Sequence, residues 1–84
     1  MDLVFKKSVL KQLKHYKKKD PVAYKIINKK LDDIREDPYN IRYKKVVTYP
    51  SYKRAKKGDY RICFKVVGDV IYVGRIEDRS GAYD

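Results

Sequence analysis

Basic side chains are concentrated in one short stretch of the sequence, residues 42–61. The stretch holds eight Lys and Arg residues against a single acid, Asp59, and so carries +7 of the chain's net charge of +11. The bases are Arg42, Lys44, Lys45, Lys53, Arg54, Lys56, Lys57 and Arg61. Guanidinium and ammonium groups bind phosphate oxygens, and Arg does so through two parallel hydrogen bonds. The surplus therefore predicts a polyanionic partner, with nucleic acid considered first.

Strand alternation divides these bases between two faces of a predicted sheet. In a strand over 52–57, Arg54 and Lys56 share one face. The opposite face of that strand carries Lys53, Ala55 and Lys57. In a strand over 60–67 the apolar face holds Ile62, Phe64 and Val66, and the other holds Arg61, Cys63 and Lys65.

The last predicted strand, 70–76, places Ile71, Val73 and Arg75 on one face by the same alternation. Given a suitable register, a twisted sheet would gather four of the bases on its open face. These four candidates are Arg54, Lys56, Arg61 and Arg75. The plain alternative is a solvated strand face, and for Arg61, between a turn and an apolar strand, a functional role is favoured.

Tyrosines near this cluster offer planes on which nucleic-acid bases can stack. Tyr52, Tyr60 and Tyr83 are the candidates by position. For most of the nine tyrosines of the chain, packing in a core or an interface is the better explanation.

Several kinds of catalytic site are excluded by what the sequence lacks. His15 is the only histidine, so a nuclease that uses paired histidines is excluded. Asp32 and Asp33 are adjacent and do not face the same way on a helix, so no metal site is predicted. Cys63 is the only cysteine, which excludes an internal disulfide and a multi-cysteine zinc site. An enzyme of this sequence would use Arg, Lys and Tyr without a cofactor.

Two helices are predicted to follow a short strand over 2–6. The first begins near Ser8 as N-cap, with Phe5, Val9, Leu13 and Tyr16 at helical spacing. The second begins at Asp20-Pro21, a capping acid before a proline, and ends near Asp37-Pro38. Its apolar stripe is Ala23, Ile27, Leu31 and Ile34. The two helices form an antiparallel hairpin with a shared apolar side.

The remainder of the chain is typical of antiparallel strands. Val46-Val47-Thr48-Tyr49 predicts a strand that stops at Pro50. Gly58-Asp59 and Gly68-Asp69 are turn dipeptides between the strands 52–57, 60–67 and 70–76. The fold class is therefore α+β in the order β-α-α-β-β-β, as a single domain over 1–84. The length fits one small core, and no apolar run is long enough to span a membrane, so we expect a soluble cytoplasmic protein.

The segment Tyr52-Lys53-Arg54-Ala55-Lys56-Lys57-Gly58-Asp59-Tyr60-Arg61-Ile62-Cys63-Phe64, with Val73-Gly74-Arg75 and the tail to Tyr83, resembles the RelE/ParE superfamily of type II toxins. Together with the length, charge and element order, it resembles the RelE branch, whose members are ribosome-dependent mRNA endonucleases. The resemblance implies cleavage of mRNA in the ribosomal A site by attack of the ribose 2′-hydroxyl on the adjacent phosphate.

The resemblance also implies roles for individual residues. Arg54 and Lys56 match the alternating bases before the turn, with Lys56 the candidate for proton transfer. Arg61 matches the arginine that contacts the scissile phosphate. Arg75 matches the basic residue after the glycine of the last strand, with Arg79 as its possible substitute, and Tyr83 matches the tyrosine that orients the nucleotide. The RNA-binding candidates around them are Lys44, Lys45, Lys53, Lys57 and Arg79.

Partners follow from the same resemblance: the ribosome with its mRNA, and a RelB-like antitoxin that presents acids to the basic face. Two alternatives remain open. One is a ParE-like inhibitor of DNA gyrase with the same fold, and the other is a nucleic-acid-binding module without catalysis.

Overall fold

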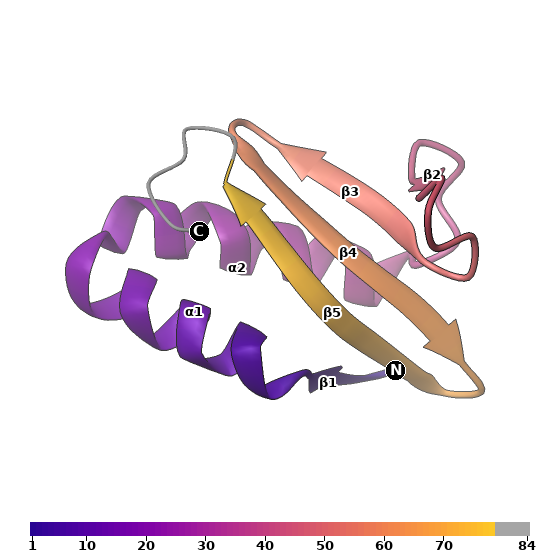
Figure 1. The fold of residues 1–84 in the computed structure, drawn as a ribbon, viewed down its shortest axis with the longest axis horizontal. Helices are drawn as coiled ribbons and strands as arrows, with labels where there is room; N and C mark the ends of the chain where they lie inside the picture. Colours follow the sequence, from indigo (N-terminus) through magenta and orange to yellow (C-terminus); the bar gives the residue numbers. More distant parts are fainter. Residues whose placement is uncertain (79–84) are drawn as a thin grey trace.

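The computed structural model describes residues 1–78 of the chain. A five-stranded sheet carries two helices, and in Figure 1 helix α2 passes behind strands β3, β4 and β5. The viewer therefore faces the side of the sheet that α2 does not cover, which we call the open face. The elements are β1 (Asp2–Phe5), α1 (Lys7–Lys19), α2 (Pro21–Glu36), β2 (Lys44–Lys45), β3 (Lys53–Lys57), β4 (Tyr60–Val67) and β5 (Val70–Asp78).

The strands lie in the order β1-β5-β4-β3-β2. Strands β2 to β5 form an antiparallel meander, of which the sequence predicted β3, β4 and β5, whereas β1 pairs in parallel with β5, which makes the sheet mixed. The turn glycines Gly58 and Gly68 have φ of +58° and +59°. Positive φ at the first central position is typical of a two-residue hairpin turn, which explains both Gly-Asp pairs.

Helix α1 begins one residue before the predicted N-cap. Lys6, not Ser8, is the N-cap, and its carbonyl accepts the first helical hydrogen bonds from Val9 and Leu10. The backbone N–H of Lys6 still donates to the carbonyl oxygen of Val73 in β5. The chain therefore passes from β1 into α1 with a single residue between them, and Ser8 falls inside the helix.

Helix α2 agrees with the sequence at both ends. Asp20 accepts a hydrogen bond from the N–H of Ala23 at 3.1 Å, and Pro21 occupies the first helical turn. The predicted stripe of Ala23, Ile27, Leu31 and Ile34 is buried. It packs with Val9 and Tyr16 of α1 and with the inner face of the sheet in one hydrophobic core. No helix in the described part of the chain is long and apolar enough to cross a membrane.

The predicted strand at residues 46–49 is wrong. Strand β2 consists of Lys44–Lys45, and residues 46–52 form a loop. The N–H of Val46 donates to Tyr52, and two further turn bonds, from Tyr49 to Val46 and from Tyr52 to Tyr49, fold the loop on itself. The backbone groups that a strand would offer to β3 are used within the loop, so pairing stops at Lys45 although Val-Val-Thr-Tyr has a strong strand propensity.

Candidate functional site

A bulge in β5 decides which face Arg75 occupies. Cys63 lies opposite Arg75 and the next residue, Phe64, lies opposite Val73, so Gly74 is an extra residue on β5. The prediction that Ile71, Val73 and Arg75 share one face is therefore wrong. An extra residue reverses the alternation beyond it, which turns Arg75 to the open face while Ile76 takes the next core position.

Two rows of cross-strand neighbours then form on the open face. Residues directly opposite one another in paired strands project from the same side of a sheet. The first row runs across β2, β3, β4 and β5 through Lys44, Arg54, Cys63 and Arg75. The second row runs across β3, β4 and β5 through Lys56, Arg61 and Glu77. The four bases matched to catalytic roles thus lie on one face in adjacent rows.

The other predicted RNA-binding lysines do not join this face. Lys45 lies opposite Lys53, and Lys57 lies opposite Tyr60, in the rows that alternate with those of the open face. The ammonium of Lys53 lies 5.7 Å from the centre of the Tyr39 ring, on the side of the sheet that holds Ala55. Of the predicted RNA-binding lysines, only Lys44 is placed beside the four candidates.

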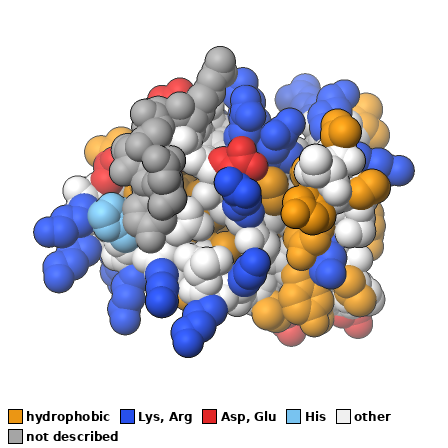
Figure 2. Space-filling view, in the orientation of Figure 1, with side chains coloured by type: hydrophobic (Ala, Val, Ile, Leu, Met, Phe, Trp, Pro, Cys, Tyr) orange, Lys and Arg blue, Asp and Glu red, His pale blue; other side chains and the backbone are white. Residues whose placement is uncertain are grey.

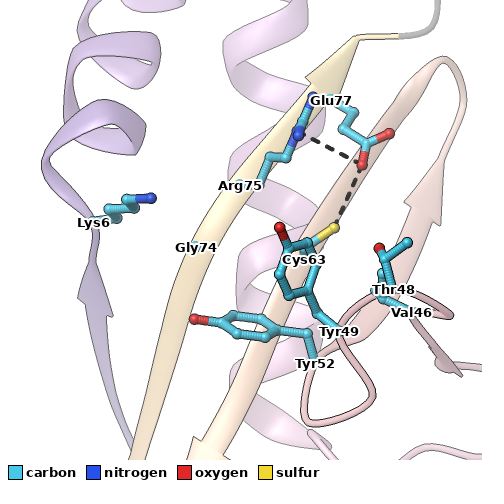
Figure 3. A pocket seen from close by; sticks show the side chains of 9 residues that line it. All are labelled: Lys6, Val46, Thr48, Tyr49, Tyr52, Cys63, Gly74, Arg75 and Glu77. Atoms are coloured by element: carbon cyan, nitrogen blue, oxygen red, sulfur yellow. Dashed lines mark hydrogen bonds and ion pairs between the residues drawn. The ribbon is translucent and has the colours of Figure 1, made fainter.

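A pocket of about 310 Å³ opens on the first row. Figure 3 shows its nine lining residues: Lys6, Val46, Thr48, Tyr49, Tyr52, Cys63, Gly74, Arg75 and Glu77. The rings of Tyr49 and Tyr52 reach from the 46–52 loop toward β4 and β5. In Figure 2, Lys and Arg side chains gather around an acidic group over this part of the sheet, with hydrophobic side chains beside them near β2. The loop that the sequence assigned to a strand therefore supplies one wall of the pocket.

Cys63 and Glu77 form a polar contact on the pocket floor. The thiol Sγ donates to Glu77 Oε1 at 3.7 Å, and the same oxygen lies 3.8 Å from Nε of Arg75 (Figure 3). Burial raises the pKa of the Cys63 thiol to about 11, and the negative charge and hydrogen bond of Glu77 add to the increase, while Arg54 and Arg75 oppose it. Cys63 therefore remains a neutral thiol near pH 7 and is no nucleophile there.

The two described candidate tyrosines have different positions. The ring of Tyr52 lines the pocket, and the ammonium of Lys65 lies 5.2 Å from its centre. Tyr60 packs edge-on against Tyr16 at 5.9 Å between ring centres, and burial raises the pKa of its hydroxyl. Packing against the core thus explains Tyr60, whereas Tyr52 presents a ring to the pocket. The remaining candidates Tyr83 and Arg79 lie outside the described residues.

The sequence did not identify three features of this site. The pocket wall at Val46, Thr48 and Tyr49 was hidden by the strand propensity of that segment. Lys6 reaches the pocket only because β1 pairs with β5. The signal that could have located the bulge was Gly74, since a glycine inside a strand often marks one. Within residues 1–78 no cluster of His, Cys, Asp and Glu is suited to hold a metal ion.

Comparison with known proteins supplies the family. No protein-family model matches the sequence. The toxin RelE3 of Methanocaldococcus jannaschii is 32% identical over 90 residues, which span 100% of this chain and 97% of the relative. Among solved structures, the RelB-RelE antitoxin-toxin complex from Methanococcus jannaschii contains a chain that is 30% identical, with a TM-score of 0.60 over 96% of this chain and 95% of that one.

A second solved structure matches the fold at lower identity. The YoeB-YefM complex from Staphylococcus aureus gives a TM-score of 0.78 over 92% of this chain and 94% of that chain, at 15% identity. The expected α+β fold, a strand and a helical hairpin followed by antiparallel strands, is thus confirmed, and the two-residue β2 makes one strand more than the expected β-α-α-β-β-β order. The full-length sequence match establishes more than the fold: the chain belongs to the RelE family of toxins.

Proposed function

We propose that this toxin is a ribosome-dependent endoribonuclease that cleaves mRNA in the A site. The observation that carries the proposal is the pair of basic rows on the open face. Arg54 and Arg75 lie on either side of Cys63, and Lys56 and Arg61 are neighbours in the adjacent row. A phosphate above these rows would meet guanidinium groups from three strands.

This arrangement suits attack of a 2′-hydroxyl on the adjacent phosphate. Negative charge grows on the phosphoryl oxygens in the transition state, and fixed guanidinium groups stabilise it more than they stabilise the bound substrate. Arg61 is half-buried in the middle of the sheet, so its position is constrained by neighbours on both sides. We assign the phosphate contact to Arg61, Arg54 and Arg75, and proton donation to the leaving oxygen to Lys56.

The other candidates keep supporting roles in the proposal. Lys44 extends the first row and would contact the RNA backbone, and the ring of Tyr52 offers a stacking plane at the pocket. Tyr83 and Arg79 are proposed, from the family resemblance alone, to orient the nucleotide and to contact RNA.

The proposal includes an antitoxin as partner. The solved relatives are complexes of a toxin with RelB or YefM. A chain with a net charge of +11 attracts an acidic partner, and an antitoxin that covers the open face would block the rows described above.

The test is cleavage of mRNA by the purified toxin in a translation system, with transcript ends mapped by primer extension. The wild type should cut at the A-site codon, and Arg61→Ala should lower the rate by about 100-fold or more, the typical effect of removing one transition-state donor. Lys57→Ala is the matched control, because Lys57 lies near the same turn in an alternating row, and it should cleave at the wild-type rate.

Two other results would point to other functions. Intact mRNA together with inhibited plasmid supercoiling would identify a gyrase inhibitor. Salt-dependent binding of free RNA or DNA, without growth arrest and without cleavage, would identify a simple binding module.

A further inference from the structure

Glu77 is an acidic side chain among the basic side chains of this site. Among the described residues that line the 310 Å³ pocket, it is the single carboxylate, and it lies opposite Arg61 on the open face. Its side chain is 31% exposed, so it neither reaches freely into solvent nor is sealed in the core. Gly74, Arg75 and Glu77 also line a second pocket, of about 570 Å³, beside the start of α1. The Glu77 carboxylate is therefore accessible from both pockets.

Apart from Asp78, which accepts a hydrogen bond from Tyr16 at 3.4 Å, the charged groups around Glu77 are hydrogen-bond donors, as is the Cys63 thiol. Arg75 comes from β5, Arg61 and Cys63 from β4, Lys6 from the β1–α1 junction, and Lys11 from α1. Guanidinium and ammonium groups donate protons and have no acceptor atom. Cleavage by a 2′-hydroxyl, however, requires that a proton be accepted as well as donated.

We propose that Glu77 is the general base that removes the proton from the attacking 2′-hydroxyl. This inference rests on the proposed RNA cleavage. The ion pair with Arg75 and the hydrogen bond from Cys63 hold the carboxylate beside the row of Lys44, Arg54, Cys63 and Arg75, and both use Oε1 rather than Oε2. Lys56, in the same row as Glu77 but two strands away, is the matching proton donor.

The step balances with these two groups. The 2′-hydroxyl proton passes to the Glu77 carboxylate, and the 2′-oxygen electron pair forms a bond to phosphorus. The bond between phosphorus and the 5′-oxygen breaks, and that oxygen takes a proton from the Lys56 ammonium. The products are a 2′,3′-cyclic phosphate and a 5′-hydroxyl end. The proton on Glu77 then returns to the Lys56 amine through solvent, which restores both groups.

The test is single-turnover cleavage of mRNA on programmed ribosomes by the full chain and by Glu77→Gln, which keeps the shape and removes the basic oxygen. The rate at saturating toxin should fall about 100-fold or more, the usual contribution of a general base. The toxin concentration for half-maximal rate should stay unchanged or fall, because a negative charge beside the phosphate has been removed. Glu36→Gln is the matched control, since Glu36 is the only other glutamate and is exposed at the end of α2.

A second variant separates a chemical role from a structural one. In Glu77→Ala, added formate should restore part of the cleavage rate in proportion to its concentration, and chloride at the same ionic strength should not. If the wild type cleaves mRNA and Glu77→Gln cleaves it equally fast or faster, the inference is overturned. That result would show instead that Glu77 restrains Arg75. Loss of rate in Glu77→Ala without any response to formate would also overturn it. Absence of cleavage by the wild type would instead refute the proposed function.

Discussion

The ring of Tyr52 lies directly against Gly74. A Cβ atom at Gly74 would come within 2.9 Å of Tyr52 Cε2 and 3.2 Å of its hydroxyl oxygen. Real Cβ atoms rarely come this close to a neighbouring atom, so the ring fits because residue 74 has no side chain. The same glycine forms the bulge that turns Arg75 to the open face. One residue thus sets both the floor of the pocket and the position of one of its bases.

Gly74→Ala should therefore displace Tyr52 and lower the free energy of unfolding by about 1–3 kcal/mol, the usual cost of forcing an extra methyl group into a packed site. RNA cleavage should fall as well, because the pocket wall moves. Chemical denaturation measures the first effect and primer extension the second. In a Tyr52→Ala background the same substitution should cost much less, and an equal cost in both backgrounds would show that Tyr52 is not the obstacle.

The two residues of β2 provide an internal comparison of the sheet faces. Lys44 lies opposite Arg54 and Lys45 opposite Lys53, so neighbouring lysines project from opposite sides. Lys44→Ala should weaken binding of a short single-stranded RNA and reduce the slope of log affinity against log salt by about 0.7, the value for one lost contact. Lys45→Ala should leave the slope unchanged. Equal effects of the two substitutions would contradict the assignment of the open face.

The Cys63 thiol provides a chemical probe of Glu77. Because the folded thiol has a pKa of about 11 against 9.0 for an ordinary one, its alkylation by iodoacetamide should rise with a midpoint near pH 11. Glu77→Gln removes a negative charge and should lower this midpoint. Mass spectrometry gives an unambiguous result because Cys63 is the only cysteine. A midpoint near 9 in the folded wild type would contradict the buried thiol.

The difference between the pKa of Cys63 in the folded and in the unfolded chain also determines how the free energy of unfolding changes with pH. Between about pH 9 and pH 11 the folded chain holds a proton that the unfolded chain releases. The contribution of Cys63 is therefore fully present below pH 9 and is lost as the pH rises through 11. Cys63→Ala should make the free energy of unfolding fall less steeply over this range, as measured by denaturation at a series of pH values.

Helix α2 should depend on its cap. Asp20 accepts the hydrogen bond from the N–H of Ala23, so Asp20→Ala should lower the free energy of unfolding by about 0.5–2 kcal/mol. Asp32→Ala is the control, because Asp32 is exposed within the same helix, and its effect should be within about 0.5 kcal/mol of zero. RNA cleavage at low temperature should be unchanged in both variants. A larger loss for Asp32→Ala would contradict the capping role.

The elements that sequence could predict are those fixed by local chemistry. Asp20-Pro21 and the stripe from Ala23 to Ile34 specified α2, and the Gly-Asp pairs specified two hairpins. The 46–52 loop could not be predicted, because its valines favour a strand and only the turn bonds between Val46, Tyr49 and Tyr52 outweigh that preference. The parallel pairing of β1 with β5 joins residues far apart in the chain, and no local pattern encodes it.

The candidate site could likewise be predicted only where a local rule, the alternation of side chains along a strand, applies. Alternation placed Arg54 with Lys56, and Arg61 with Cys63, because a period of two is fixed by strand geometry. It failed at Arg75, because the bulge at Gly74 shifts the period by one residue. Alternation alone also does not place Glu77 opposite Arg61, since that pairing depends on the register between β4 and β5.

The parallel pairing of β1 with β5 also governs when the molecule can form during synthesis. The first strand of the chain finds its partner only after residues 70–78 have been made. Contacts between distant segments require closure of a long loop and form slowly, so the sheet is completed late in folding. Arg75 and Glu77 both belong to that last strand. A nascent chain that ends before β5 therefore has neither, and a protein that we propose acts on ribosomes acquires its site only after residues 70–78 have been translated.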